Sequence, residues 1–482
     1  MGQPPSSATR ARSTLFALVA MALDKGGGVL VLLLLARLLA PEDFGRYAAL
    51  MSLLAFLQIA AEFGQEPVLV RLLAQQRAAG RVDDLVRGAI SMRLWLAVAA
   101  GLVLVAAGRL VMPSLGVGAL ALAAGGLVAS AGMALRALFR AVQRIEALCV
   151  IALMRVGTFT VALIAGHLLG YGFLAAIGGW ALGQLAASLT AAALARPRVA
   201  PGPRWSGEVA GRLARSGWAL AANAFLLTTT LRVGHLIVLR LEGPAAVGHL
   251  AAGAQLAEAF ALLPEAVMLT LLPVLSAYEI DRPAAQRALG AQAMRWFVLL
   301  ALPVIIVVSV LAPTLLGVLY GPAYVEGAAA LRILAWLALL AATGTVFTNL
   351  LIARGLERSL LAVNAIGSGL TLGLSLVAVP RFGFVGAAAA TLVASVVSQA
   401  VLLALAPMRA DVAACLRPLP GPIALAIVLV LGGIVLGGSS VTAAGVAVAI
   451  FAIVLVATGA VGAPDWALIR RAAGLGGARD PG

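Results

Sequence analysis

The feature that most constrains this chain is a succession of apolar runs, each about the length of a membrane-spanning helix. The hydrocarbon core of a bilayer is about 30 Å thick, and about 20 apolar residues cross it as a helix. Such runs lie at 14–40, 44–66, 88–111, 116–138, 147–169, 172–195, 213–241, 248–273, 292–319, 327–352, 359–380, 383–407, 420–437 and 441–463. The sequence therefore predicts an all-α integral membrane protein with about fourteen transmembrane helices.

The composition supports the same fold class. Of the 482 residues, 62% are hydrophobic and 11% are charged, whereas soluble domains have about 45–50% apolar and roughly 25% charged residues. So few charges cannot cover this much apolar surface in water, which excludes a soluble enzyme and a secreted disulfide scaffold. The two cysteines, Cys149 and Cys415, support neither a disulfide framework nor a metal site. We expect no cofactor.

The basic residues predict the orientation in the membrane, because arginine and lysine accumulate in cytoplasmic loops. If the runs alternate across the bilayer, 25 of the 34 basic residues, including Arg93, fall on one side of the membrane. Only Arg46, Arg109 and Arg381 fall on the other side. We therefore expect a multi-pass membrane protein with both termini in the cytoplasm. The asymmetry also accounts for the net charge of +15 without a nucleic-acid partner.

The sequence contains a weak internal repeat. Residues 36–49 (ARLLAPEDFGRYAA) align with residues 239–252 (LRLEGPAAVGHLAA) at a shift of 203. The paired residues are Arg37 with Arg240, Pro41 with Pro244 and Gly45 with Gly248, and further on, at a shift of 211, Glu146 with Glu357 and Thr160 with Thr371. A shift of six helices keeps both copies in the same orientation, so the repeat is parallel. Transporters of this kind bind substrate between the two halves.

The repeat predicts the domain organisation. We expect a six-helix N-lobe at 1–198, a cytoplasmic linker at 199–212 and a six-helix C-lobe at 213–408. Residues 409–482 form an additional helix pair and a tail outside the repeat. The spacings Gly179–Gly183, Gly369–Gly373 and Gly433–Gly437 are helix-packing signals.

Charged residues inside the spans mark the candidate site, because a charge at the centre of a spanning helix costs about 2.5–3.5 kcal/mol on insertion scales. Asp24 and Lys25 lie near the middle of the first run, and Lys25 is the only lysine in the chain. In the functional interpretation Lys25 contacts an anion and Asp24 pairs with it or exchanges a proton. A structural ion pair with another helix is the alternative.

Several other helices carry polar faces. The candidates for a hydrated substrate cavity, besides Lys25, are Arg155, Arg232, His235, Gln255 and Asn364. The candidates for coupling to protons or sodium are Asp24, Glu62, Glu258 and Glu265. The alternative for each face is hydrogen bonding between helices, which contributes about 0.6 kcal/mol per bond. We interpret Arg37, Arg240 and Arg332, near helix ends, as structural.

No enzyme signature is present in the sequence. There is no glycine loop ending in Lys-Ser/Thr and no histidine pair at metal-ligand spacing. We therefore do not expect an enzyme. A membrane-embedded glycan ligase or polymerase would also need a long outer loop, and none of the predicted outer loops is long.

Four segments of the sequence fit a known family pattern: ARLLAPEDFGRYAALMSLLAFLQIAAEFG (36–64), YGPAYVEGAAALRILAW (320–336), and the pair ARGLERSLLAVN (353–364) and PRFGFVGAAAATLVAS (380–395). They resemble the oligosaccharide flippase family, the Wzx-like polysaccharide biosynthesis and export proteins of the MOP superfamily. Lipid II flippases and MATE exporters are related families. The resemblance covers residues from about 10 to 410.

The resemblance implies a two-lobed, V-shaped protein of the bacterial inner membrane that moves polyprenyl-pyrophosphate-linked sugars from the cytoplasmic to the outer leaflet. It also implies a cationic central cavity, which Lys25, Arg155 and Arg232 would supply, and a lipid-tail groove at the last helix pair. The expected partners are the lipid-linked oligosaccharide, membrane lipid and glycan polymerase or ligase machinery, around a monomeric transport unit. The alternative is a cation-coupled, MATE-like multidrug or small-solute exporter, which the mixed acidic and basic interior would suit.

Overall fold

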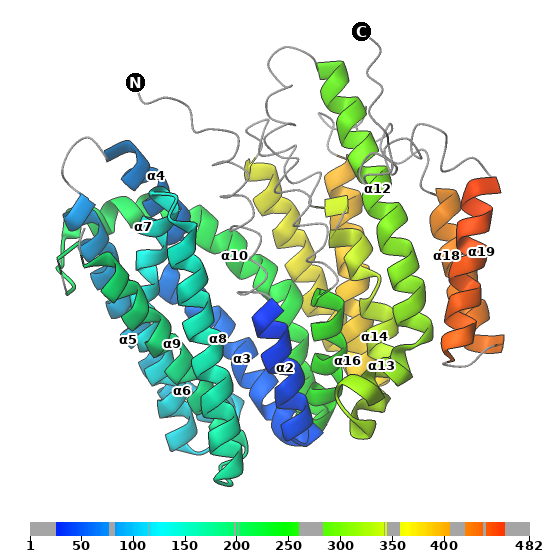
Figure 1. Ribbon diagram of the computed structural model, residues 1–482, viewed down its shortest axis with the longest axis horizontal. Coiled ribbons are helices and arrows are strands. Elements are labelled where there is room, and N and C mark those ends of the chain that lie inside the picture. The colour runs from blue at the N-terminus through cyan, green and yellow to red at the C-terminus, as the bar shows by residue number, and fades with distance from the viewer. Residues whose placement is uncertain are drawn as a thin grey trace. The chain divides into compact units, whose positions relative to one another are not determined.

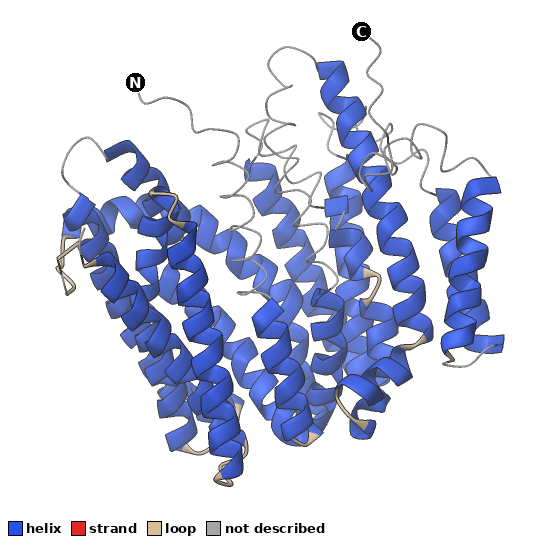
Figure 2. Cartoon of the chain, in the orientation of Figure 1, coloured by secondary structure: helices blue, strands red, loops and turns tan. Residues whose placement is uncertain are grey.

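The computed structural model describes residues 26–76, 82–113, 115–196, 199–200, 202–259, 283–341, 343–344, 357–404, 420–436 and 440–457. Most of these residues are helical, and this described part of the chain contains no strand (Figures 1 and 2). Eight of its helices are long and apolar enough to cross a membrane. The predicted all-α membrane fold is therefore confirmed.

The helices of the first half follow the predicted runs closely. In chain order they are α2 (Gly27–Leu38), α3 (Pro41–Glu62), α4 (Gln65–Gln76), α5 (Val82–Val111), α6 (Val117–Ala129), the 3₁₀ helix η2 (Ser130–Leu135), α7 (Arg136–Ala141), α8 (Ile145–Leu168) and α9 (Phe173–Ala195). The expected span at 116–138 is thus a helix that passes through a 3₁₀ segment before its last turn.

Local chemistry sets both ends of α3. Pro41 occupies the first turn, where its missing N–H leaves no hydrogen bond unmade, and two acidic residues follow it at the positive end of the helix dipole. The helix ends where Phe63 and Gly64 adopt positive φ angles of 49° and 66°. The chain then resumes as α4 at Gln65. The expected single helix at 44–66 is therefore interrupted near its end.

The second half begins with α10 (Gly207–Glu242), a helix of 36 residues. The Ser206 hydroxyl accepts a hydrogen bond from the Val209 N–H at 3.3 Å and so caps its first turn. The helix starts ahead of the expected position 213, within the predicted linker. Gly243, with φ of 89°, separates α10 from a helix at 244–259.

Two predicted spans meet in α16 (Glu357–Ala404). Its helical hydrogen-bonding pattern continues through Gly383, but this residue has φ of 63° and ψ of −150°, which is not helical. The backbone N–H of Phe384 donates to the Glu242 carboxylate at 3.0 Å, just after this point. The two expected spans at 359–380 and 383–407 are therefore joined at a bend that glycine permits.

The remaining described helices are α12 (Pro283–Val310), α13 (Ala312–Leu319), η3 (Pro322–Gly327), α14 (Ala328–Leu334), α18 (Pro420–Leu436) and α19 (Val441–Ala457). Residue contacts divide the chain into two units. Unit 1 comprises Met1–Gln255, Leu316–Ala330 and Leu356–Ser398, and unit 2 comprises the rest. Within unit 2, α12 packs against α18 and α19, and the Val310 side chain lies close to Gly433.

Unit 1 carries apolar side chains on its outer helix faces. On α8, for example, Val161 and Leu168 are 68% and 80% exposed. A soluble protein would rarely expose so much contiguous apolar surface. These faces fit a lipid environment, in agreement with the predicted spans.

Glycines allow the close packing of α8 against α9, which run side by side (Figure 1). A Cβ atom added at Gly179 would lie 2.8 Å from the Phe159 ring, and one at Gly183 would lie 2.8 Å from the Arg155 carbonyl oxygen. The predicted packing role of this glycine pair is confirmed. Gly369 and Gly373, in contrast, have no described atom within 4 Å of such a Cβ.

Candidate substrate cavity

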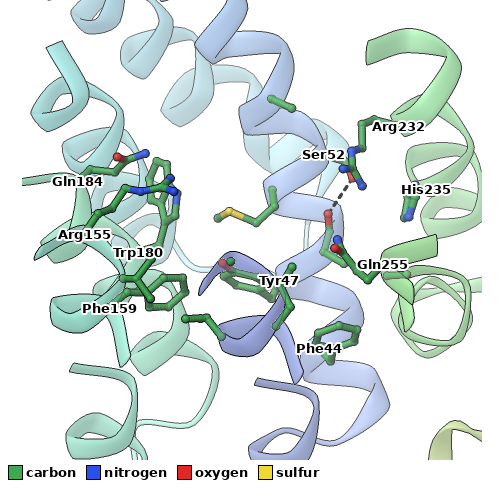
Figure 3. A pocket seen from close by; sticks show the side chains of 18 residues that line it. Phe44, Tyr47, Ser52, Arg155, Phe159, Trp180, Gln184, Arg232, His235 and Gln255 are labelled. Atoms are coloured by element: carbon green, nitrogen blue, oxygen red, sulfur yellow. Dashed lines mark hydrogen bonds between the residues drawn. The ribbon is translucent and has the colours of Figure 1, made fainter. Parts of the chain in front are cut away.

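Unit 1 contains a cavity of about 250 Å³. Side chains from α2, α3, α8, α9, α10 and the helix at 244–259 line it (Figure 3). The polar lining residues are Ser52, Arg155, Gln184, Arg232, His235 and Gln255, and the aromatic ones are Phe44, Tyr47, Phe159 and Trp180. Residues far apart in the sequence therefore form one cavity inside the helix bundle, with these polar groups set in a mostly apolar lining.

Four of the predicted cavity residues, Arg155, Arg232, His235 and Gln255, line this space. Arg155 lies on α8, where the close approach of Gly183 to its backbone holds the two helices together. Arg232 and His235 lie three residues apart on α10 and face the cavity from the opposite side (Figure 3). Two arginines, an imidazole and an amide side chain therefore line one small volume.

His235 is 4% exposed, and in the described structure neither of its ring nitrogens has a hydrogen-bond partner. A buried polar group without a partner is costly, so such groups in native proteins usually bind water or a ligand. The imidazole therefore offers a donor and an acceptor to a molecule in the cavity.

Three predicted site residues lie outside the described residues. They are Asp24, Lys25 and Glu265. Glu258 is described, lies three residues after Gln255 on the same helix, and is not among the residues that line the cavity.

Asn364 takes part in a contact between helices. Its side-chain N–H donates to the side-chain oxygen (Oδ1) of Asn223 at 2.7 Å, so it links α16 to α10. It is not among the residues that line the cavity. The structure thus places Asn364 in the kind of interhelical hydrogen bond that was the alternative for its polar face.

Glu62 lies in a charged cluster where α3 ends. Its carboxylate is 3.7 Å from the guanidinium of Arg93, and the Glu66 carboxylate is 3.0 Å from that of Arg140. Arg93 is only 8% exposed and lies inside α5. Arg93 therefore lies buried within a helix rather than exposed in a loop, because a nearby carboxylate compensates its charge.

Charge alone did not identify the remaining lining residues. Tyr47, Ser52, Phe159, Trp180 and Gln184 were not predicted, because uncharged side chains on a spanning helix usually pack against other helices. Spacing is the signal that could have found them. Phe159 follows Arg155 by four residues and Gln184 follows Trp180 by four, so each pair shares one helix face.

One end of unit 1 is formed by two chain corners, between α2 and α3 and between α10 and the helix at 244–259. We call it the corner end. An added Cβ at Gly45 would lie 1.7 Å from the Pro244 carbonyl oxygen, and one at Gly248 would lie 2.2 Å from that of Pro41. These four residues are the ones that the internal repeat pairs. The two copies of the motif thus contact each other reciprocally, and only glycine fits.

Further contacts support the corner end. The Tyr324 hydroxyl donates to the Leu39 carbonyl oxygen at 3.0 Å. The His249 imidazole lies 3.3 Å from the Glu326 carboxylate. Arg37 donates to the carbonyl oxygens of Leu319, at 2.9 Å, and of Val318. The interpretation of Arg37 as structural agrees with these bonds.

The fold and the cavity define the protein class. The chain has many apolar helices, and one helical unit encloses a cavity with several polar side chains, which is the architecture of a multi-pass membrane protein with an internal binding space. Residues 34–329 match the sequence profile of the polysaccharide biosynthesis protein family. The chain belongs to this family, which agrees with the resemblance to Wzx-like polysaccharide biosynthesis proteins.

Solved structures show the same fold. A lipid II flippase MurJ in an inward closed conformation is 14% identical with a TM-score of 0.67, over 92% of this chain and 98% of that chain. An inward-facing MATE multidrug resistance transporter of the MOP superfamily is 15% identical with a TM-score of 0.66, over 83% and 98%. A MOP superfamily transporter from Pyrococcus furiosus, described as having a binding pocket of reverse polarity, is 14% identical with a TM-score of 0.54, over 84% and 95%.

A search of curated proteins found no significant match. The family is one of polysaccharide biosynthesis proteins, and the fold is shared with a lipid II flippase and with MATE transporters.

Proposed function

We propose that this protein moves a polyprenyl-pyrophosphate-linked oligosaccharide from the cytoplasmic to the outer leaflet by alternating access, for the synthesis of a surface polysaccharide such as O-antigen, capsule or exopolysaccharide. The observation that carries the proposal is the cavity, in which Arg155, Arg232 and His235 lie together with two glutamine side chains. The membership of a polysaccharide biosynthesis family and the fold shared with a lipid II flippase support it.

The cavity chemistry suits such a headgroup. A sugar linked to two phosphates cannot cross hydrocarbon unaided, because each buried polar group without a partner costs several kcal/mol. Arginine side chains bind phosphate oxygens through charge-assisted hydrogen bonds. Amide and hydroxyl groups, here those of Gln184, Gln255 and Ser52, exchange hydrogen bonds with sugar hydroxyls. The lipid tail would remain in the bilayer during transport.

The arginine distribution orients this cycle. We assign the corner end to the outside and the opposite, arginine-rich end, where α3 ends and α8 begins, to the cytoplasm. The two lobes at 1–198 and 213–408 would move against each other around the linker at 199–212. The helix pair within 409–482 would accommodate the lipid tail. Lys25 completes the proposed site, and Asp24, Glu62, Glu258 and Glu265 are the candidates for ion coupling.

The test uses Arg155→Ala and Arg232→Ala in cells whose surface glycan depends on this gene, and in proteoliposomes that contain the lipid-linked oligosaccharide. Each loss of a charge-assisted hydrogen bond should lower transport about tenfold or more. Arg109→Ala is the matched control, because this exposed arginine lies in the last turn of α5, away from the cavity. Unchanged transport in both cavity variants would refute the assignment.

A MATE-like exporter of drugs or small solutes is the second candidate function. The shared fold and the aromatic side chains of the cavity favour it. Two arginines in the same cavity oppose it, because they repel an organic cation. Efflux of a lipophilic cation from loaded proteoliposomes, together with no movement of lipid-linked sugar, would establish this alternative.

A further inference from the structure

The two sides of the cavity differ in chemistry. Phe159 and Trp180 project from α8 and α9 on one side, and Tyr47 of α3 lies beside them (Figure 3). We call Tyr47, Phe159 and Trp180 the aromatic wall. Arg232, His235 and Gln255 face it from the other side and bring no aromatic carbocycle (Figure 3). A ligand in this space would contact the aromatic wall with one face and Arg232, His235 and Gln255 with the other, while Arg155 and Gln184 lie on the same helices as the wall, one turn away (Figure 3).

Glycines hold the aromatic wall in position. An added Cβ at Gly126 would lie 2.4 Å from the Trp180 ring, and one at Gly179 would lie 2.8 Å from the Phe159 ring. Each ring therefore occupies the space that a side chain would otherwise fill on a neighbouring helix. The backbone of Tyr47 lies on α3, and its side chain is 3% exposed. The wall is built from packed and well-defined rings, which suits a rigid binding surface.

The polar and aromatic positions also have a fixed order along the helices. On α8, Arg155 is one turn nearer the arginine-rich end than Phe159, and on α9, Gln184 is one turn nearer that end than Trp180. One turn of four residues corresponds to about 6 Å. This is the scale on which a phosphate group and the adjoining sugar ring are separated. Phosphate bound at the arginines would place the next ring against the aromatic wall.

We propose that the aromatic wall is a stacking subsite for the pyranose ring that adjoins the pyrophosphate. This inference rests on the proposed flippase function. A pyranose ring presents an apolar C–H face and a rim of hydroxyl groups, so it matches one aromatic side and one polar side of a cavity. Aromatic rings supply large contact area at low conformational cost. Trp180 and Phe159 are therefore specificity-determining residues for a glycosylated lipid.

The experiment compares two lipids that bind the purified protein in nanodiscs: polyprenyl pyrophosphate, and the same lipid carrying one hexose. In the parent protein the hexose should increase affinity. Trp180→Ala should reduce affinity for the glycosylated lipid about tenfold, the size of an aromatic contact of about 1.4 kcal/mol, and leave the sugar-free lipid unchanged. Trp180→Phe should retain most of the affinity. Trp218→Ala, at a half-exposed tryptophan of α10, is the matched control.

The other outcomes are decisive as well. If Trp180→Ala weakens both lipids equally or neither, the wall has no role in sugar binding and the inference is overturned. If it weakens only a lipophilic cation such as tetraphenylphosphonium, the wall serves an exporter instead. If Trp180→Ala does not fold, Phe159→Leu, which keeps an apolar side chain without the aromatic face, gives the same comparison.

The two proposals fail separately. A parent protein that binds neither lipid contradicts the flippase function itself. A parent protein that moves both lipids and binds them with equal affinity leaves the flippase function intact and contradicts only the stacking subsite.

Discussion

The reciprocal contact at the corner end leads to a prediction about conformational balance. Gly45→Ala would place a methyl group 1.7 Å from the Pro244 carbonyl oxygen, and Gly248→Ala one 2.2 Å from that of Pro41. Ordinary van der Waals contact begins at 3.4 Å. The neighbours are backbone atoms and cannot rotate away, so the two corners must separate.

The size of the effect follows from the overlap. Forcing an extra methyl group into a packed contact typically costs about 1–3 kcal/mol. If the cost applies only while the corners touch, it lowers the population of the corner-closed state about 5- to 150-fold relative to the open state. Gly118→Ala is the matched control, since its added Cβ has no atom within 4 Å.

The assay is the accessibility of a single cysteine in the cavity. Ser52→Cys, in a background without Cys149 and Cys415, is exposed to a membrane-impermeant thiol reagent added outside the cell. Gly45→Ala should accelerate its labelling by a factor within that range, and Gly118→Ala should leave the rate unchanged. In inside-out vesicles, Gly45→Ala should slow the labelling. Folded Gly45→Ala protein that labels at the parent rate from both sides would refute the idea that the repeat-related corners close the cavity.

Two more predictions concern the polar contacts away from the cavity. Arg93→Met should lower the free energy of unfolding by about 1–3 kcal/mol, because it leaves the partly buried Glu62 carboxylate unpaired. Adding Glu62→Gln to this variant should recover part of the loss. Chemical denaturation of Arg93→Met, Glu62→Gln and the double variant measures the effect, and strictly additive losses would contradict the pairing. Asn364→Ala should lower the free energy of unfolding by only about 0.6 kcal/mol, because it breaks the hydrogen bond to Asn223, and transport should stay near the parent level. A transport defect as large as that of Arg232→Ala would instead place Asn364 in the substrate path.

Spacing and charge predicted part of the candidate site. Arg155, Arg232, His235 and Gln255 were found because charge or polarity inside a spanning helix requires an explanation, and they line one cavity. Asn364 carries the same signal but pairs with another helix. A single sequence cannot distinguish these cases, since both uses satisfy the same polar group.

Apolar run length, arginine asymmetry and the Pro41–Gly45 repeat are all local patterns, and they were enough to predict a bundle of membrane-spanning helices. Which residues share the cavity, and which ring faces which charge, depends on how the helices pack in three dimensions. Trp180 enters the site because Gly126, far away in the sequence, leaves room for its indole. Arg93 is buried for the similar reason that a carboxylate on another helix lies beside it. Contacts between distant segments depend on helix rotation and approach, and periodicity along one helix carries no information about its neighbours.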